Sequence, residues 1–330
     1  MSPLVSVIIP TANRPHYLPR AVESALAGMQ PGEVEVIVVP NGPDQSWRES
    51  LRDFSENPQI RIEPIEKAHA CAARNHGLTL AKGRFVRFLD DDDYLYPELA
   101  VVQYQVMETS GADVCAGGID IIDSTGYAIK FWGQPDTDDF VIATLSPTRM
   151  TAVHAHIFQR QSIQNHYWDE NLAVRQDTDW MMRLCAHKGL LWVRMEGAVG
   201  AYVQHQMSRV SKGTDPGSKA LRHTAEGILQ VVHQLEIRGE LTHDRRIAAS
   251  DGLWSALQKG LMYQPAYWIG IAHKARQLAD DRRPPSRIYH SMFTKWVDPL
   301  WLTLVLAPAR LLYVLSRKIG LRIHDAIKKK

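Results

Sequence analysis

The sequence predicts an α/β fold in which a mixed sheet flanked by helices occupies residues 1–215 and a helical region follows at 216–330. Three observations predict it. Short runs of β-branched residues alternate with amphipathic stretches over the first 95 residues, four consecutive aspartates end one of these runs, and apolar residues follow helical spacing from Lys219 onward. Such alternation favours βαβ units and a mainly parallel sheet covered by helices on both faces.

The elements of the first 95 residues follow from these runs. Four segments rich in Val and Ile are expected to be strands: Leu4–Ile9, Val34–Val39, Ile60–Ile65 and Arg84–Leu89. Apolar spacing of threes and fours, as at Leu18, Val22 and Ala25, predicts helices between them. These helices are His16–Met29, Ser46–Ser55 and His69–Ala81, and a fourth is expected at Pro97–Thr109.

The order of elements becomes mixed further along the chain. The turn sequence Asp123-Ser124-Thr125-Gly126 predicts a hairpin of Val114–Ile122 and Tyr127–Phe131. Three further strands are expected at Val153–Phe158, Leu190–Arg194 and Val199–His205. A helix is expected at Asp177–His187. The polar segment Ser208–Ser218 predicts a flexible loop and a domain boundary.

Composition sets broad limits. The chain has 330 residues, 45 % of them hydrophobic and 22 % charged, as in an ordinary globular protein with a sizeable core. Its three cysteines, Cys71, Cys115 and Cys185, form no zinc or redox motif, so we expect reduced thiols. The N-terminus enters a strand at Leu4 without the features of a signal peptide, which favours a cytoplasmic location.

The acidic run Asp90–Asp93 follows the fourth strand directly. Neighbouring carboxylates repel one another unless a cation lies on them, and hard divalent cations select oxygen ligands. Because ligands of open α/β sheets bind at the carboxyl ends of the strands, the run predicts a Mg²⁺ or Mn²⁺ site that receives a diphosphate. The alternative is a solvated acidic turn or a helix N-terminus, with Pro97 at an early helical position.

Three segments carry a resemblance to a known family. They read VSVIIPTANRPHYLPRAVESALA from residue 5, AARNHGLTLAKGRFVRFLDDDD from residue 72 and WDENLAVRQDTDWMMRL from residue 168. In this order they make residues 4–211 resemble the inverting family 2 glycosyltransferases of GT-A fold. The resemblance implies a metal-dependent transfer of a sugar from a UDP-, dTDP- or GDP-sugar to a hydroxyl group. Residues after about 216 have no such resemblance.

The resemblance also implies a donor site at the ends of the strands. Its nucleotide-sugar-binding positions correspond to Pro10, Thr11, Asn13, Arg14, Asn41, Arg74, Asp90 and Asp91. The resemblance implies that Asp92 binds the metal ion. The family usually has two aspartates after its second strand, where this chain has Pro40 and Asn41, so the nucleotide stays open. For Arg74 the alternative is an exposed charge on a helix.

The resemblance implies a general base as well. The family has a Glu-Asp pair whose aspartate deprotonates the acceptor, and here the pair reads Gln176-Asp177. Loss of the neighbouring acid removes a like charge that would raise the pKa of Asp177. Asp179 is the second candidate. The alternative role of Asp177 is a helix N-cap, which is compatible with catalysis.

Histidines are the remaining candidates. His205 resembles the histidine of a Tyr-x-x-His-x-x-Ser segment of the family, which implies a contact with the metal or the diphosphate. Its alternative is a surface histidine. Arg209 and Lys212 follow His205 and are expected to meet the leaving group. His154 and His156 alternate on a predicted strand, and we expect them to be structural or to face the acceptor.

The C-terminal region predicts a membrane contact. Segment 296–315 is strongly apolar, but its uncharged stretch between Asp298 and Arg310 has 11 residues, shorter than the ~20 of a spanning helix. Tryptophans at its start and seven Lys or Arg against one acid from Arg310 to Lys330 are typical of a helix in the inner-leaflet interface. A buried core helix or a dimer interface is the alternative.

Taken together, these features predict an acceptor that is a glycan or is lipid-linked. A nucleotidyltransferase would share the acidic site, but the sequence has no Gly-rich phosphate loop followed by Lys near its start. A non-catalytic nucleotide-sugar binding protein would require Asp177 to be unproductive. A nucleic-acid-binding protein would use the basic tail, but the Trp-rich apolar flank argues against it, so no nucleic acid partner is expected. Salt-dependent binding to DNA would revive this alternative.

Overall fold

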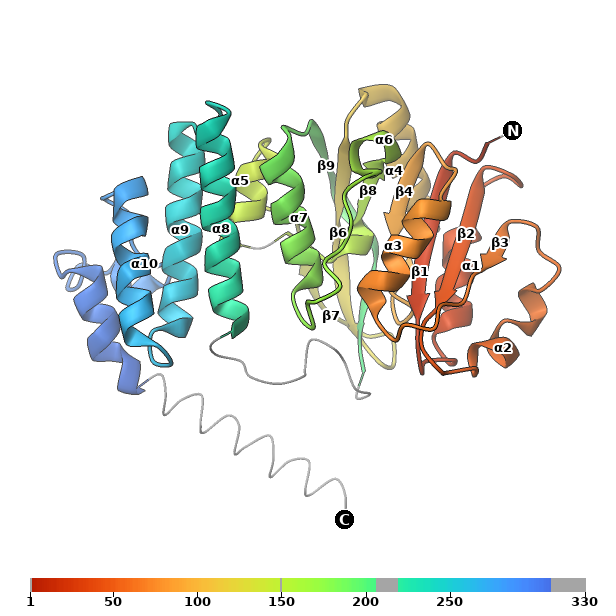
Figure 1. Cartoon of the computed structure of the whole chain (residues 1–330), viewed down its shortest axis with the longest axis horizontal. Coiled ribbons are helices and arrows are strands. Elements are labelled where there is room, and N and C mark those ends of the chain that lie inside the picture. Colours follow the sequence, from red (N-terminus) through yellow and green to blue (C-terminus); the bar gives the residue numbers. More distant parts are fainter. Residues whose placement is uncertain (1, 149, 206–218, 310–330) are drawn as a thin grey trace, which may run out of the picture. The chain divides into compact units, whose positions relative to one another are not determined.

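The computed structural model describes residues 2–148, 150–205 and 219–309 (Figure 1). The chain divides into two compact units. Unit 1 comprises Met1–Thr144 and Thr148–Gly213, and unit 2 comprises Leu145–Pro147 and Thr214–Lys330. The segment Ser208–Ser218, for which a loop is predicted, lies outside the described residues together with Arg209 and Lys212.

Unit 1 is built on one mixed sheet of nine strands. The strands are β1 (Val5–Thr11), β2 (Val34–Pro40), β3 (Ile60–Ile62), β4 (Phe85–Phe88), β5 (Tyr94–Leu95), β6 (Val114–Asp123), β7 (Ala128–Trp132), β8 (His156–Gln159) and β9 (Trp192–Gln204). Their order is β3-β2-β1-β4-β8-β6-β9-β5, and β7 pairs with β6. The first four strands of this order are parallel, whereas β8 is antiparallel to both of its neighbours.

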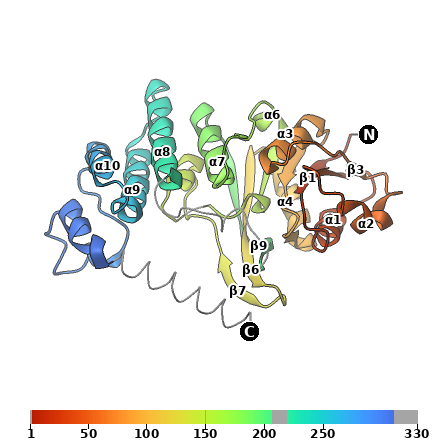
Figure 2. The ribbon, with the colours of Figure 1, turned by 60° about the horizontal axis from the view of Figure 1, so that its bottom comes forward.

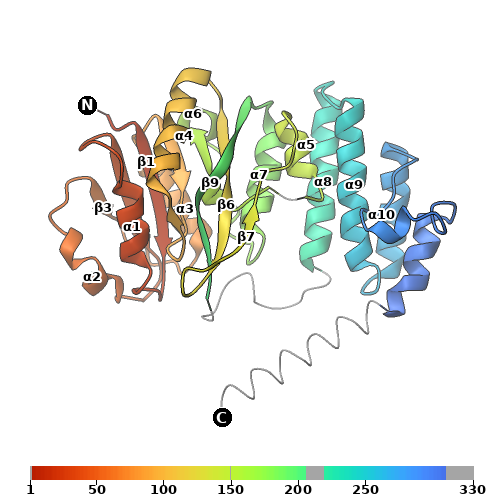
Figure 3. The ribbon, with the colours of Figure 1, turned by 180° about the vertical axis from the view of Figure 1, so that it is seen from behind.

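Helices cover both faces of this sheet. They are α1 (Leu18–Leu26), α2 (Trp47–Ser50), α3 (Ala70–Leu80), α4 (Pro97–Ser110), α5 (Phe140–Leu145), α6 (Arg160–Ile163) and α7 (Gln176–His187), with 3₁₀ turns η1 (Arg52–Phe54) and η2 (Val153–Ala155). Figures 1 and 3 show α3 and α7 on one face and α1 and α4 on the other. The predicted mixed sheet flanked by helices is thus confirmed.

The alternation of side chains along β1 explains these two layers. Val5, Val7 and Ile9 pack with residues of α1 and α4 in one buried cluster. Ile8 points to the opposite face, where α3 crosses it at Gly77. A Cβ on Gly77 would lie 2.4 Å from the Ile8 side chain, so the close approach of helix and strand requires glycine there.

Several predicted elements of unit 1 differ in detail. The strand predicted at Val153–Phe158 is wrong in its first half, because residues 153–155 form η2 and the strand begins at His156. The two strands predicted at Leu190–Arg194 and Val199–His205 are one strand, β9, whose pairing register with β6 shifts near Gly197. Gly197 has a φ of +87°, a backbone conformation that glycine adopts without strain. The predicted hairpin of β6 and β7 is confirmed and projects from the sheet in Figure 2.

Unit 2 is helical, as predicted from its apolar spacing. Its elements are α8 (Lys219–Ile237), α9 (His243–Gly260), α10 (Pro265–Leu278) and the 3₁₀ turn η4 (Arg287–Tyr289), and residues 299–309 are also helical. Trp254 and Trp268 are fully buried in its core. Among the described residues, no helix combines the length and the apolar character that crossing a bilayer requires.

Candidate active site

The carboxyl ends of three parallel strands bring the predicted donor-binding loops together. Thr11 at the end of β1 pairs with Pro40 of β2, and Ile8 pairs with Phe88 of β4. Asn41 follows β2, and both its backbone N–H and its side-chain amide donate to the Thr11 carbonyl, at 3.0 and 2.9 Å. The loops after β1, β2 and β4 therefore meet at one edge of the sheet.

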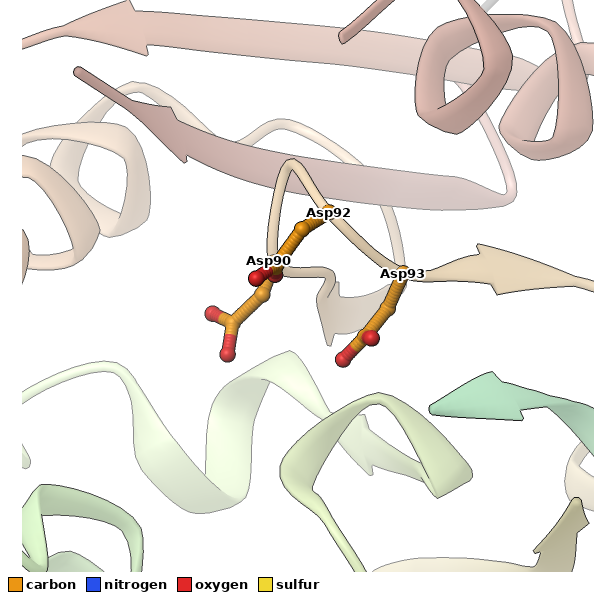
Figure 4. A group of neighbouring side chains, drawn as sticks. All are labelled: Asp90, Asp92 and Asp93. Atoms are coloured by element: carbon orange, nitrogen blue, oxygen red, sulfur yellow. The ribbon is translucent and has the colours of Figure 1, made fainter. Parts of the chain in front are cut away.

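The acidic turn, residues 90–93, follows β4 at this edge. The backbone N–H of Asp93 donates to the Asp90 carbonyl at 3.1 Å and closes a turn. One carboxylate oxygen each from Asp90, Asp92 and Asp93 lies within 4.8 Å of the other two (Figure 4). Asp91, Asp92 and Asp93 are at most 5 % exposed. The alternative of a solvated acidic turn is therefore wrong.

Arg14 and Thr11 hold the middle of the acidic turn. The Thr11 hydroxyl donates to Asp91 at 2.7 Å, and the Arg14 guanidinium lies 2.9 Å from both Asp91 and Asp92. Burial raises the pKa of Asp91 to about 7, although Arg14 opposes the shift. The cost of burying the charged carboxylate therefore outweighs the attraction of Arg14, and Asp91 ionises less readily than in water.

His205, the residue directly after β9, contacts the same acidic turn. Its Nε2 lies 2.7 Å from an Asp92 carboxylate oxygen, and the Tyr17 ring stacks on the imidazole with centroids 4.8 Å apart. Only 4 % of His205 is exposed, so the alternative of a surface histidine is wrong. The structure brings together the two residues predicted to hold the metal. The contact of Tyr17 with His205 was not predicted. The only indication in the sequence was that Tyr17 lies within the first of the three family segments.

Asp93 is the residue of the acidic run to which the sequence assigned no individual role. Its carboxylate accepts a hydrogen bond from the Val203 backbone N–H at 2.9 Å and lies 3.3 Å from His154 Nδ1. Burial raises the pKa of Asp93 to about 6, against the opposing effect of His154. His154 is fully buried, so it faces no acceptor. Asp93 thus holds the last residues of β9 beside the acidic turn, and His205 follows these residues directly.

Arg74 of α3 joins the acidic turn to α7. Its guanidinium donates to Asp90 at 2.6 Å and to the Gln176 side-chain oxygen at 3.0 Å, and it lies over the Trp168 ring at 4.6 Å. Arg74 is only 6 % exposed, which makes the alternative of an exposed helix charge wrong. Burial alone would raise the pKa of Asp90, but the Arg74 charge lowers it below the ordinary value.

Asp177 lies in the first turn of α7, beside Gln176. The N-cap position belongs to Arg175, whose φ is +58°, so the alternative of Asp177 as N-cap is wrong. The Asp177 carboxylate accepts from the Thr178 backbone N–H at 2.8 Å. Asp179 is buried against Arg183, with 2.8 Å between the charged groups. Asp177, half-buried, is thus the carboxylate of this pair that is more accessible to a ligand.

The position of α7 relative to α3 is fixed by a set of polar contacts that the sequence did not reveal. The Asn75 side chain accepts from the Trp168 backbone N–H at 2.7 Å and donates to the Trp168 carbonyl at 3.0 Å and to Glu170 at 2.9 Å. Trp168 stacks on Trp180 of α7 with centroids 4.9 Å apart. These contacts explain why Trp168-Asp169-Glu170 precedes the helix that carries Asp177.

Two predicted donor residues lie at the margin of this arrangement. Asn13 is exposed, has a φ of +59°, and its backbone N–H donates to Asp44 at 2.8 Å. Pro10 is buried within β1. Neither contacts the acidic turn through a hydrogen bond that the structure gives, so their donor contacts stay predictions. Asp44, which orients the Asn13 loop, was missed because it belongs to no motif.

The donor set fits a hard divalent cation. Carboxylate oxygens of Asp90, Asp92 and Asp93 lie within 4.8 Å of one another, and His205 Nε2 lies 2.7 Å from an Asp92 oxygen beside them. The Asp90 side chain is 36 % exposed against 7 % for Asp92, so it is the carboxylate best placed to meet a ligand from solvent.

Comparisons with known proteins agree with this geometry. The family model described as glycosyl transferase family 2 matches residues 6–189. An uncharacterized glycosyltransferase of Rickettsia bellii is 28 % identical over 190 residues, 55 % of this chain and 27 % of the relative. Glycosyltransferase GlyG of Streptococcus pneumoniae is 31 % identical over 150 residues, 44 % of this chain and 48 % of the relative. The chain thus spans about a quarter to a half of the length of these relatives.

A solved structure shares the fold. S. aureus TarS 1–349 in complex with UDP-GlcNAc superposes with a TM-score of 0.59 at 16 % identity, over 84 % of this chain and 90 % of that one. At this identity the likeness concerns the fold, and it confirms the predicted GT-A architecture.

Proposed function

Because the chain belongs to glycosyl transferase family 2, we propose that it moves a sugar from a nucleotide-sugar donor to a hydroxyl of a glycan or lipid-linked acceptor, with inversion at the anomeric carbon. The observation that carries the proposal is the Arg74 bridge. It connects Asp90 of the acidic turn with Gln176, the neighbour of Asp177. One side chain thus holds the donor-binding edge and the proposed base in a fixed relation.

The donor in this proposal is a UDP-, dTDP- or GDP-sugar. TarS has been solved with UDP-GlcNAc, which supports a nucleotide-sugar but not a particular base for this chain. The Thr11 carbonyl fixes the amide nitrogen of Asn41, so the Asn41 side-chain oxygen is the atom that would accept from a base N–H. Thr11, Arg14 and Asp91 form the floor on which the nucleotide would lie, with Pro10 and Asn13 at its margin.

Asp92, His205 and Asp90 are the residues that would hold Mg²⁺ or Mn²⁺. A bound divalent cation would supply positive charge to the departing diphosphate. The protein contributes the placement of these ligands: Asp93 anchors β9 and thereby His205, and Arg14 holds Asp92. Arg14 and Arg74 add fixed positive charges at this edge of the sheet.

Asp177 is the proposed general base. It would take the proton of the acceptor hydroxyl as that oxygen attacks the anomeric carbon, a contribution of about 10²–10⁴-fold. Asp179, the neighbouring carboxylate, is already bound by Arg183, which leaves Asp177 without a second carboxylate to act as a nucleophile beside it. The proposal therefore takes Asp177 as the base of a single displacement, which would invert the anomeric carbon.

The acceptor and location are further parts of the proposal. A lipid-linked sugar acceptor at the cytoplasmic face of a membrane would suit an enzyme of polysaccharide or glycolipid assembly. The contacts described for the donor half of the site do not identify the hydroxyl that is glycosylated. The acceptor therefore has to be identified by assay.

Asp177→Asn tests the proposal, with Glu196→Gln, at an exposed acid of β9, as its control. Donor hydrolysis and transfer are measured for UDP-, dTDP- and GDP-sugars with and without Mn²⁺. We expect Asp177→Asn to bind donor like the wild type and to lose about 10²–10⁴-fold in turnover. Glu196→Gln should retain turnover within a few-fold. Wild-type turnover in Asp177→Asn would overturn the assignment, and nucleotide binding without any turnover of the wild type would favour a non-catalytic binding protein.

A further inference from the structure

Residues 288–305 of unit 2 present an exposed apolar surface. Seven of the fifteen large exposed hydrophobic side chains in the described part of the chain lie in this short segment: Ile288, Met292, Phe293, Trp296, Trp301, Leu304 and Val305. Phe293 is 91 % exposed and Trp296 is 83 % exposed. Single exposed hydrophobic residues are ordinary, whereas a concentration of them marks a binding surface.

The helix at residues 299–309 has apolar side chains both toward and away from unit 2. Leu302 and Thr303 are buried, and the Thr303 hydroxyl lies 2.9 Å from that of the fully buried Tyr289. Trp301, Leu304 and Val305 lie on the outer side and are 41–58 % exposed. The inner residues already attach the helix to unit 2, so packing within the unit does not explain the outer ones.

The loop before this helix is held in one conformation. The Arg283 guanidinium donates to the backbone carbonyls of Thr294, Lys295 and Val297. Asp298 pairs with Arg276 at 2.5 Å and accepts from the first backbone N–H groups of the helix. Phe293 and Trp296 are therefore displayed on a fixed loop, which lowers the ordering cost of binding.

The charges around this surface indicate what it binds. Residues 282–297 contain four cations between the flanking acids Asp280, Asp281 and Asp298. Arg282 pairs with Asp251 and Arg283 donates to backbone carbonyls, so Arg287 and Lys295 are the cations considered for a ligand. The Lys295 ammonium lies 5.0 Å from the Trp296 ring centre. Residues 310–330, which follow the helix, contain seven Lys or Arg and one Asp. Apolar residues beside cations suit anionic lipid head groups, whereas a second copy of the same surface would place like charges together.

We propose that the exposed apolar surface of residues 288–305 binds the surface of an anionic phospholipid bilayer. Its aromatic side chains enter the head-group layer, and the neighbouring lysine and arginine side chains contact the lipid phosphates. The inference goes beyond the transfer reaction and does not depend on it. Most of the contact is assigned to η4 and the loop up to residue 298. The sequence had instead indicated a helix at 296–315 as the contacting element.

The full chain is tested by sedimentation with vesicles of phosphatidylcholine mixed with phosphatidylglycerol, and with vesicles of phosphatidylcholine alone. The double variant Phe293→Ser, Trp296→Ser is compared with Ile237→Ser, which changes another exposed apolar residue of unit 2, 66 % exposed at the end of α8. We expect the wild type and Ile237→Ser to bind the mixed vesicles, and the double variant to bind at least about tenfold more weakly.

Two further measurements guard against a misfolded variant and against self-association. Quenching of wild-type tryptophan fluorescence by brominated lipid reports insertion without any substitution, and light scattering reports the oligomeric state. No vesicle binding, equal binding to neutral vesicles, or unchanged binding of the double variant would overturn the proposal. So would a dimer that the double variant dissociates. The assay contains no sugar donor, so its failure is separate from a failure of the proposed transfer.

Discussion

At the acidic turn of unit 1, three carboxylates are almost fully buried and Arg14, Arg74 and His205 lie around the turn. In residues 288–305 of unit 2, by contrast, Phe293 and Trp296 extend into solvent. Burying charge and exposing large apolar groups both cost free energy unless a partner compensates. The difference supports two different kinds of proposed site: a polar one for a charged small ligand in unit 1, and an apolar one for an extended surface in unit 2.

Asp92→Asn should have the largest effect, because it removes a charged oxygen ligand from the proposed cation site. We expect Mn²⁺ affinity to be lost and turnover to fall by about 100-fold or more, as chelation of the wild type should also cause. Mn²⁺ binding by calorimetry and turnover with and without chelator measure this. Asp123→Asn, an exposed carboxylate of the β6–β7 turn, is the control. Ordinary Mn²⁺ affinity in Asp92→Asn would refute the site.

Acid should lower the free energy of unfolding of unit 1, because the buried His166 is neutral in the folded state. Burial lowers the pKa of His166 to about 4, from about 6.5 in the unfolded chain. Its neutral form therefore stabilises the fold above pH about 6.5, and this contribution is lost as the pH falls toward about 4. Down to pH about 4.5 the loss is about 2 kcal/mol.

His166→Asn removes this titration and keeps an N–H that can donate to the Trp180 carbonyl, as the imidazole does at 2.8 Å. Urea unfolding at pH about 7 and about 4.5 compares the variant with the wild type. We expect the variant to be less stable at neutral pH, and its free energy of unfolding to depend less on pH by about 2 kcal/mol. An equal pH dependence in both proteins would show that His166 does not titrate on unfolding.

Arg74→Lys should separate the two ends of the Arg74 bridge. An ammonium keeps the charge beside Asp90 but lacks the planar fork that also reaches Gln176. Because Asp90 is partly exposed, we expect a loss of only about 1–2 kcal/mol in the free energy of unfolding. Turnover should fall about tenfold, with a smaller change in donor affinity.

The matched control for Arg74→Lys is Arg84→Lys, at an exposed arginine 3.9 Å from Glu108. It should change neither stability nor turnover. If Arg74→Lys keeps wild-type kcat, the bridge does not position Asp177.

Tyr289→Phe should have the smallest effect and concerns unit 2. The variant removes the buried hydroxyl that contacts Thr303, and Thr303 still donates to the Pro299 carbonyl at 2.7 Å. We expect a loss of about 1 kcal/mol in the free energy of unfolding. Tyr263→Phe, at a partly exposed tyrosine, is the control. An unchanged unfolding curve for Tyr289→Phe would show that this hydroxyl does not help to hold the helix at 299–309.

Local patterns in the sequence predicted most strands and helices of the first 131 residues and the acidic turn, because β-branched runs and helical spacing reflect nearby residues. They missed β5, whose two residues are too short a run to form a pattern. They did not reveal that Asp93 binds Val203, or that Arg74 reaches Gln176, since each contact joins residues about a hundred positions apart. Residues 153–155 were mistaken for strand because their apolar composition suits both conformations. The exposure of Trp301 required coordinates, because a short apolar helix fits a core equally well.

The most direct test of the central claim is a crystal structure of the chain with UDP and Mn²⁺. The account predicts anomalous density for Mn²⁺ about 2.2 Å from an Asp92 oxygen, bridging to the diphosphate, with Asp177 across the same cavity. A nucleotide bound away from the acidic turn, or a cation that none of Asp90, Asp92 and His205 contacts, would contradict it.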